Sequence, residues 1–251
     1  MPRATVFVIV EGQTENTVLT RLLGAHLGTM GVDLHCPIVK IGAGRGGVKW
    51  LRCEDVCDQI RRFLKGPRQP FVTTFFDYYA LPQGIKSGWE FVATAKGEVS
   101  FRGLDVTVQS IESELHSLAI AGLELPNIAN RFVPYIQLHE LEALFFAEPE
   151  KMAALFEAPT LARKFAAAVA ECGSCEEIND SPETAPSKRI QNEFRGYIKG
   201  RSDFAHGPRL ADILDLNTVR QACPRFSTWV ARLESLAPVV ETGEIPPPPQ
   251  P

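Results

Sequence analysis

The chain has 251 residues, 45% of them hydrophobic, which suits one large α/β domain or one domain with a helical extension. A formal net charge of -4 argues against a general polyanion-binding protein, so any nucleic-acid surface has to be a local patch. No stretch approaches the roughly 20 apolar residues of a membrane span, and the first apolar run is too short for a signal peptide. We therefore expect a cytoplasmic protein without a membrane partner.

The first third of the chain alternates strand and helix patterns. Runs of apolar, largely β-branched residues predict strands at 4–10, 33–41 and 71–76. Apolar side chains at helical spacing predict helices at 15–29 and about 50–65 between them. Such alternation is typical of βαβ units, so we expect an α/β fold with a mostly parallel central sheet flanked by helices.

The rest of the chain becomes mainly helical. After a long irregular segment that starts at Asp77, we expect a helix over about 101–121, a strand over 131–138 and a helix from 139 to about 156. Further helical patterns follow from about Leu161 onward. We therefore divide the chain into an α/β core (1–158), a helical C-terminal extension packed on the core (159–240) and a disordered proline-rich tail (241–251).

Acidic residues follow the predicted strands. Glu11 ends the first strand and Asp77 ends the third, while Glu15, Glu140 and Glu142 lie at the starts of expected helices. Because the carboxyl ends of parallel strands meet at one edge of a sheet, we expect these acids to converge. Carboxylate oxygens are hard ligands suited to Mg²⁺ or Mn²⁺, and a cation relieves their mutual repulsion. For Glu15 and Glu142 taken singly, an ordinary helix-start acid is an equal explanation.

Basic residues at two places are candidates for contacts with a phosphate backbone. Arg45 and Lys49 lie in or beside the loop 42–47, which matches the dinucleotide fingerprint only formally because it follows the second strand. Lys188 and Arg189 could neutralise a phosphate or the charge that develops on it. A solvated loop explains the first pair equally well, and a helix that starts near Pro186 explains the second.

His139 stands directly before two acids. The motif HELE is not the HExxH of zinc proteases, so a buried structural histidine, a general base and an orienter of a carboxylate all stay open. The aromatic residues Tyr78, Tyr79 and Trp89 could stack a base, although such side chains more often pack a loop. The six cysteines are expected to be reduced, because the lone CxxC motif lacks the second pair that a zinc site usually has.

Several motifs together resemble a known family. VEGQTE, TTFFDYYALP, PYIQLHELEALFF, INDSPETAPSKRI and CPRFSTWVARLE look like an uncharacterised bacterial Toprim-like family, domain of unknown function four-two-seven-six. These motifs span residues 6 to about 234. A strand that ends in Glu-Gly and a later strand that ends in an aspartate motif also resemble the Toprim domain of topoisomerases, primases and overcoming-lysogenization-defect (OLD) nucleases.

The Toprim resemblance implies a Mg²⁺-dependent phosphodiester chemistry. The Toprim glutamate corresponds to Glu11, and the first aspartate of the Asp-x-Asp motif corresponds to Asp77. Tyr79 stands where the second aspartate is expected, which puts a two-metal arrangement in doubt. Glu140 or Glu142 is then the candidate for the absent ligand.

We therefore hypothesise a metal-dependent nuclease that hydrolyses DNA or RNA. In this hypothesis His139 assists the acids, Lys188 matches the active-site lysine of OLD-type nucleases, and Arg45, Lys49 and Arg189 contact the nucleic acid. The resemblance also implies an ATPase partner and a role in phage defence, and a homodimer is a further expectation. The alternative is a catalytically inactive Toprim-like module that binds nucleic acid or a nucleotide and regulates a partner.

Overall fold

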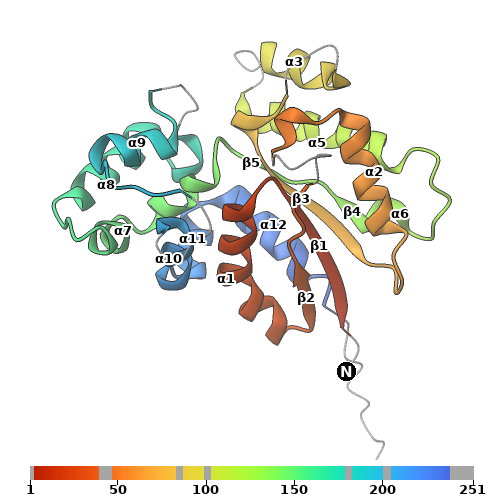
Figure 1. Cartoon of the computed structure of the whole chain (residues 1–251), viewed down its shortest axis with the longest axis horizontal. Helices are drawn as coiled ribbons and strands as arrows, with labels where there is room; N and C mark the ends of the chain where they lie inside the picture. The colour runs from red at the N-terminus through yellow and green to blue at the C-terminus, as the bar shows by residue number, and fades with distance from the viewer. Residues whose placement is uncertain are drawn as a thin grey trace, which may run out of the picture.

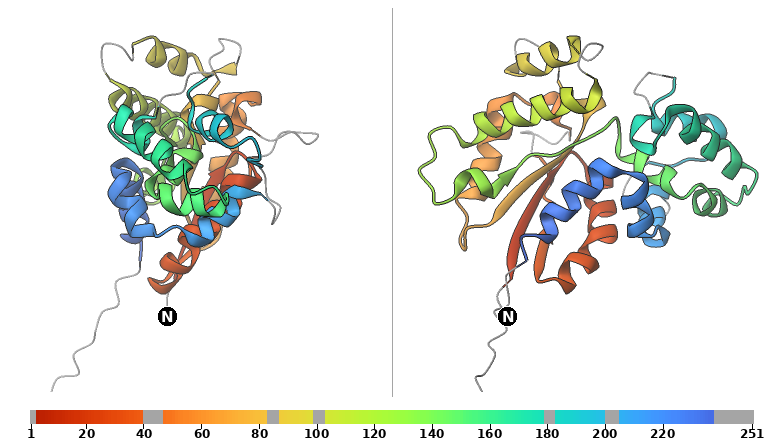
Figure 2. Two further views of the ribbon diagram at one scale, coloured as in Figure 1. Left: turned by 90° about the vertical axis from the view of Figure 1, so that its left-hand side faces the viewer. Right: turned by 180° about the vertical axis from the view of Figure 1, so that it is seen from behind.

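The computed structural model describes residues 3–39, 47–82, 87–98, 103–178, 183–199 and 205–237, and within them a parallel sheet carries helices on both faces (Figures 1 and 2). Its strands are β1 (Ala4–Val10), β2 (Val32–His35), β3 (Phe71–Asp77), β4 (Phe132–Val133) and β5 (Ile136–Gln137). The order is β2-β1-β3-β4, β5 also pairs with β3, and every pairing is parallel. The predicted α/β fold with a mostly parallel sheet is confirmed.

Successive residues of β1 face opposite sides of the sheet. Val6, Val8 and Val10 belong to a hydrophobic cluster with α1 (Gln13–Thr29), whereas Ile9 belongs to a second cluster with α2 (Cys53–Leu64) and α5 (Leu104–Ile120). β1 is buried on both faces, which explains its continuous apolar run.

The strand order places a switch point between β1 and β3. From β1 the chain passes through α1 on one face to β2, then returns through α2 on the other face to β3, on the far side of β1. In open α/β sheets the crevice outside the carboxyl ends of the strands at such a point is where ligands bind. Glu11 and Asp77 lie at the two strand ends that flank this point.

The remaining helices lie around this frame. α3 (Glu90–Gly97) and α6 (Ile128–Arg131) lie on the α5 side, and the C-terminal part holds α7 (Pro149–Leu155), α8 (Leu161–Cys172), α9 (Pro186–Glu193), α10 (His206–Ile213), α11 (Leu216–Ala222) and α12 (Pro224–Glu234). Short 3₁₀ helices are η1 (Val48–Trp50), η2 (Tyr78–Ala80), η4 (Leu141–Ala147) and η5 (Cys175–Glu177). None of the helices in the described ranges is long and apolar enough to cross a membrane.

The C-terminal part is mainly helical, as predicted, and its last helix returns to the sheet. α7, α8 and α9 stand together at the left of Figure 1, whereas α12 packs on the face that α1 also covers. Trp229 of α12 donates a hydrogen bond to Thr73 Oγ1 (2.9 Å), and its ring stacks on that of Tyr135 with centroids 4.7 Å apart. One hydrophobic cluster therefore joins N-terminal and C-terminal elements, and the division at residue 158 stays a prediction.

Two expected strands are shorter than the sequence indicated. β2 ends at His35, before Pro37, although Ile38 forms an isolated parallel bridge with Val10. The strand expected over 131–138 is divided into β4 and β5 by Pro134, which has no N–H to donate. The Thr74 hydroxyl repairs this gap: it accepts the N–H of Tyr135 and donates to the Tyr135 carbonyl, both at 2.9 Å.

The helix expected from 139 to about 156 is wrong as a single element. His139 has a left-handed backbone (φ 62°) that no helix tolerates, η4 follows in its place, and Pro149 begins a separate helix, α7. Helices α3, α6 and α11 were not expected. The glycine-rich loop with Arg45 and the proline-rich tail lie outside the described residues.

Candidate active site

Glu11 ties together three segments at the switch point. Its side chain is almost entirely buried; Oε1 accepts the backbone N–H of Asp77 (2.9 Å) and Oε2 accepts that of Val48 (3.3 Å). The pKa of the Glu11 carboxyl is raised to about 8, chiefly by burial and also by the nearby Glu15, against the lowering effect of the Asp77 amide. The carboxylate predicted to end β1 is thus held in a position where ionisation is costly.

Asp77 and Glu15 flank Glu11. Asp77 ends β3, and its Oδ1 accepts the backbone N–H of Leu141 at 3.0 Å. Burial raises the pKa of Asp77 well above its usual value, and repulsion from Glu11 and the other acids adds to this effect. Glu15 lies in the first turn of α1, where burial and then Glu142 raise its pKa.

Glu140 and Glu142 converge on a lysine. The Lys199 ammonium is 2.9 Å from Glu142 Oε1 and 3.9 Å from Glu140 Oε1. Tyr197 also donates its hydroxyl to Glu142 Oε1 at 3.2 Å. Burial lowers the pKa of Lys199, but Glu142 and Glu140 outweigh it and leave the pKa above its ordinary value, so this lysine is charged at neutral pH.

These five acids form what we call the acid cluster (Glu11, Glu15, Asp77, Glu140 and Glu142). Three stretches of the chain, 11–15, 77 and 140–142, contribute to it, and each affects the pKa of an acid in another stretch. In the described part of the chain, Lys199 is the only cation that forms an ion pair with these acids. Five carboxyls and one ammonium leave an excess of four negative charges when all are ionised, so the cluster has to take up protons or further cations.

The donor set of the acid cluster fits a hard divalent cation in kind. Mg²⁺ and Mn²⁺ prefer carboxylate oxygens, and an oxygen that accepts an amide N–H still has a second lone pair. In position the fit is incomplete, because no three His, Cys, Asp or Glu side chains of the described segments are arranged to share one ion. Binding of an ion therefore requires side-chain movement or ligands such as water.

The predicted basic residues lie in different places. Lys49 lowers the pKa of Glu11 and lies 5.0 Å from the centroid of the Trp50 ring. Lys188 is exposed, and its ammonium contacts Gln191 Oε1 at 3.3 Å, so the structure does not bring it to the acids. Arg189 pairs instead with Glu171 Oε2 at 2.9 Å.

His139 is buried beside the acid cluster, directly before Glu140. Its carbonyl accepts the N–H of Tyr79 (3.1 Å), and its ring meets the edge of the Tyr78 ring at a centroid distance of 6.5 Å. Of the three aromatic residues proposed to stack a base, Tyr78 and Trp89 are buried, and Tyr79 is 45% exposed. The first two pack the structure, which leaves Tyr79 as a candidate contact.

The sequence did not point to Lys199 or Tyr197. Both follow α9, in a short segment after the helix ends at Glu193, and no motif marks them. The backbone N–H of Ser187, near the start of α9, also donates to Glu140 Oε2 at 2.8 Å. These groups reach the acids only because the C-terminal part folds back, so local patterns carry no signal for them.

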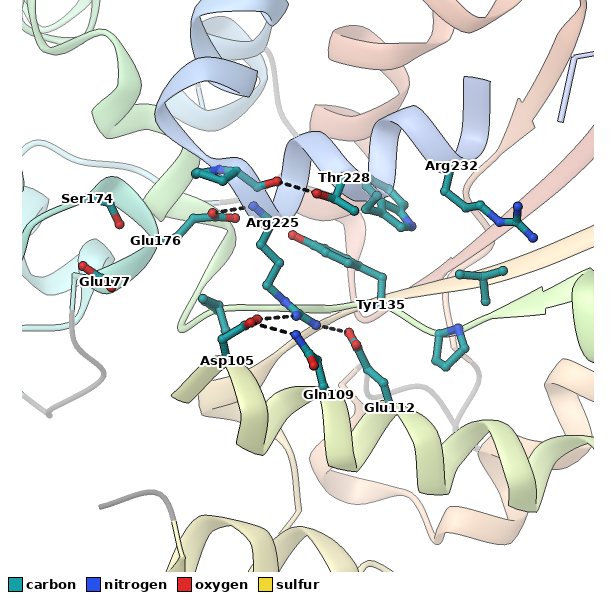
Figure 3. Close-up of a pocket in the computed structure, with 15 residues that line it drawn as sticks. Asp105, Gln109, Glu112, Tyr135, Ser174, Glu176, Glu177, Arg225, Thr228 and Arg232 are labelled. Atoms are coloured by element: carbon teal, nitrogen blue, oxygen red, sulfur yellow. Dashed lines mark hydrogen bonds and ion pairs between the residues drawn. The ribbon is translucent and has the colours of Figure 1, made fainter. Parts of the chain in front are cut away.

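A second group of charges lines a cavity of about 600 Å³ between α5, α12 and β4–β5 (Figure 3). Arg225 pairs with Asp105 at 2.7 Å and with Glu112, and its guanidinium lies 5.6 Å from the centroid of the Tyr135 ring. Glu176 accepts the N–H groups of Arg225 and Phe226, both at 2.9 Å, and so holds the first turn of α12. None of the five acids of the acid cluster lines this cavity.

Comparison with protein families matches residues 10–234 to the family described as Domain of unknown function (DUF4276). No curated protein matches the chain. Among solved structures, the C-terminal region of the Xanthomonas campestris pv. campestris OLD protein is similar at a TM-score of 0.37 and 14% identity, over 91% of this chain and 94% of that chain. A likeness of this size carries no argument about activity.

Proposed function

Because the chain belongs to the DUF4276 family, whose description states no activity, we propose a function from its site: a Mg²⁺- or Mn²⁺-dependent nuclease that hydrolyses phosphodiester bonds in DNA or RNA. One observation carries this proposal. Five carboxyls from three segments converge at the carboxyl ends of β1 and β3, with one ammonium paired to two of them. A fold that needed only stability would not keep such an excess of buried negative charge.

The charge of the acid cluster is what favours phosphodiester chemistry. Without cations it repels a phosphate, whereas a bound divalent ion attracts the phosphate and activates water as a nucleophile. Glu11 and Asp77 would hold the ion, because their carboxyls flank the switch point and their raised pKa values mark them as poorly neutralised. Glu140 or Glu142 would complete the ligand set in place of the aspartate that Tyr79 replaces.

Lys199 takes the role that the sequence assigned to Lys188. It is held beside Glu142 and Glu140, stays charged and is 44% exposed, so its ammonium can also face a ligand. There it would stabilise the negative charge that develops on a phosphate during cleavage. His139 would act by positioning Glu140, which directly follows it.

Nicking of plasmid DNA and cleavage of RNA, each with Mg²⁺ or Mn²⁺, test the proposal. We expect Glu11→Gln and Asp77→Asn to lower activity on the order of 100-fold or more, as for other groups that stabilise a charged transition state. Glu54→Gln is the matched control, because Glu54 is an exposed acid on α2 that pairs only with Arg52 at 3.4 Å in the described structure. Equal activity in wild type, both acid-cluster variants and the control would falsify the proposal that these acids catalyse cleavage.

A regulatory module that binds nucleic acid or a nucleotide without cutting it is the second candidate. Two observations favour it: Lys199 already pairs with two of the acids, and no three described acid, His or Cys side chains are arranged to share an ion. Calorimetry separates the two functions. Mn²⁺ binding that is lost in Glu11→Gln supports the nuclease, whereas salt-sensitive nucleic-acid binding without Mn²⁺ binding supports the module.

The Toprim relation, an ATPase partner and a role in phage defence rest on the resemblance of the motifs, and a homodimer is a separate expectation. Light scattering of the purified chain tests the homodimer directly. Co-purification with the product of a neighbouring ATPase gene tests the partner.

A further inference from the structure

Three of the large apolar side chains that face solvent belong to segments that contact the acid cluster. In the described part of the chain the large apolar side chains that face solvent are Met30, Trp50, Tyr79, Val106, Ile198 and Ile213. Three of them, Trp50, Tyr79 and Ile198, lie within two residues of groups that contact the cluster. Isolated exposed apolar residues are ordinary, but three from distant segments that contact one charged site require an explanation. We call these three residues the apolar rim.

Hydrogen bonds join the three segments of the apolar rim. The Glu11 carboxylate accepts the N–H groups of both Val48 and Asp77, so Trp50 and Tyr79 extend from segments that share one acceptor. The Tyr79 N–H donates to His139, whose neighbour Glu140 lies near Lys199, the residue after Ile198. The segments that carry the apolar rim are therefore held at the acid cluster by these contacts.

The apolar rim stands on ordered backbone. The N–H of Trp50 donates to the Gly47 carbonyl (3.3 Å), and Val48 of the same turn is fully buried. Ile198 exchanges two hydrogen bonds with His206, one from its N–H to Nδ1 and one from the His206 N–H to its carbonyl, both 3.0 Å. Side chains on fixed backbone lose little freedom when a ligand binds, which favours a binding surface.

We propose, on the premise of the nuclease function, that the apolar rim binds unpaired bases, so that the substrate is single-stranded nucleic acid with a base stacked on Trp50. Proteins that bind single strands combine aromatic platforms for the bases with cations along the backbone. The Lys49 ammonium lies over the Trp50 ring, 5.0 Å from its centroid, and Lys199 directly follows Ile198 in the chain, so two of the three rim segments carry a cation. In a duplex the base faces are covered by their neighbours and cannot reach such a platform.

Tryptophan fluorescence can report this stacking directly. The chain has three tryptophans, all in the described ranges, and Trp50 is 63% exposed whereas Trp89 and Trp229 are 0% and 4% exposed. Quenching by an added nucleic acid therefore reports contact with Trp50. We would titrate the full chain in the presence of Ca²⁺ with three ligands. These are a single-stranded RNA and a single-stranded DNA of the same sequence, each about 12 nucleotides long, and the matching duplex.

We expect a single strand to quench the fluorescence and to bind at least tenfold more tightly than the duplex, and the RNA and DNA arms identify the preferred sugar. Because Trp50 is itself the reporter, the variants are compared by the fluorescence anisotropy of a labelled strand. In that assay Trp50→Leu should weaken binding about tenfold, in line with the contribution of one stacked base. Trp50→Phe should restore most of the affinity, because it keeps an aromatic face. Val106→Ser is the matched control at an exposed apolar residue outside the apolar rim, and it should change nothing.

Equal binding by wild type and Trp50→Leu, equal binding of the duplex, or no binding of either strand would overturn the inference. Cleavage assays in Mg²⁺ on the same proteins separate it from the nuclease proposal. If the protein cleaves nucleic acid but binds it equally well after Trp50→Leu, the nuclease proposal stands and the stacking role of Trp50 is wrong. Binding that depends on Trp50, in a protein that never cleaves, retains the single-strand site and removes the nuclease.

Discussion

Around Arg225, the buried carboxylate of Glu112 and the exposed one of Asp105 pair with one guanidinium, whereas in the acid cluster only two of the five carboxyls pair with the single ammonium of Lys199. Arg225 joins α12 to α5, and its neighbour Glu176 holds the first turn of α12. These contacts attach the last helix to the sheet. The acid cluster joins segments too, but with an excess of like charge that no described side chain offsets. Buried charge that is nearly balanced serves the fold, whereas the excess of buried negative charge supports the proposed ligand site.

Removing the Arg225 guanidinium should have the largest effect on stability. Arg225→Met leaves Glu112 buried without its partner, so we expect the free energy of unfolding to fall by about 3–5 kcal/mol, as for other broken buried ion pairs. Urea unfolding measures this loss. Arg232→Met is the control, because Arg232 lines the same cavity but is exposed. A loss below about 1 kcal/mol, the size seen for surface pairs, would show that Arg225 does not hold α12.

Raising the pH should weaken the fold through the acid cluster. The pKa of Glu11 is about 8 in the fold against 4.5 ordinarily, so the unfolded chain loses its proton first as pH rises. The loss in free energy of unfolding that Glu11 causes is absent below pH 4.5, grows between pH 4.5 and about 8, and is complete above about 8. Within that window the Glu11 carboxyl lowers the free energy of unfolding by about 1.4 kcal/mol per pH unit.

Thermal or urea unfolding over this pH window measures the slope. Asp77→Asn removes one repelling carboxyl and should flatten it, and Mg²⁺ should flatten it further if the ion binds. Because burial also raises the pKa of Glu112 and Glu176, the comparison with wild type isolates the share of the acid cluster. An unchanged slope in Asp77→Asn would contradict the coupling.

Lys199→Met should remove the ammonium that partly balances the acid cluster. We expect a loss of about 1–3 kcal/mol at pH 8, the cost of leaving a buried charged group without its hydrogen-bond partner. Lys188→Met provides the control, since its exposed ammonium contacts only Gln191 in the described structure. Equal losses in both variants would place Lys199 among ordinary surface lysines.

Tyr197→Phe should have the smallest effect of the series. It removes one hydrogen bond to Glu142 without opening a cavity, so we expect a loss of about 1 kcal/mol. Chemical denaturation at neutral pH measures it. A higher free energy of unfolding in Tyr197→Phe would show that the hydroxyl destabilises the fold, which would favour a role in ligand binding instead.

Much of the frame follows from local patterns in the chain. The apolar runs that form β1 and β3 and the helical spacing of α1 and α2 were predicted within a few residues, and so was the parallel sheet. The points where the expected strand over 131–138 and the expected helix after it are interrupted were harder to predict. They depend on single residues whose backbone conformation is set by their surroundings, such as His139 with its positive φ. The family that the motifs indicated is confirmed over residues 10–234.

The sequence by itself determined that acids end the strands, because an apolar run that stops at a carboxylate has only one sensible register in a buried sheet. Only the tertiary structure decided which partners those acids meet. It chose Lys199 over Lys188, and it buried Trp89 while leaving Trp50 exposed beside Glu11. The physical reason is that strand and helix patterns depend on residues close in sequence, whereas contacts between distant segments depend on how the whole chain packs.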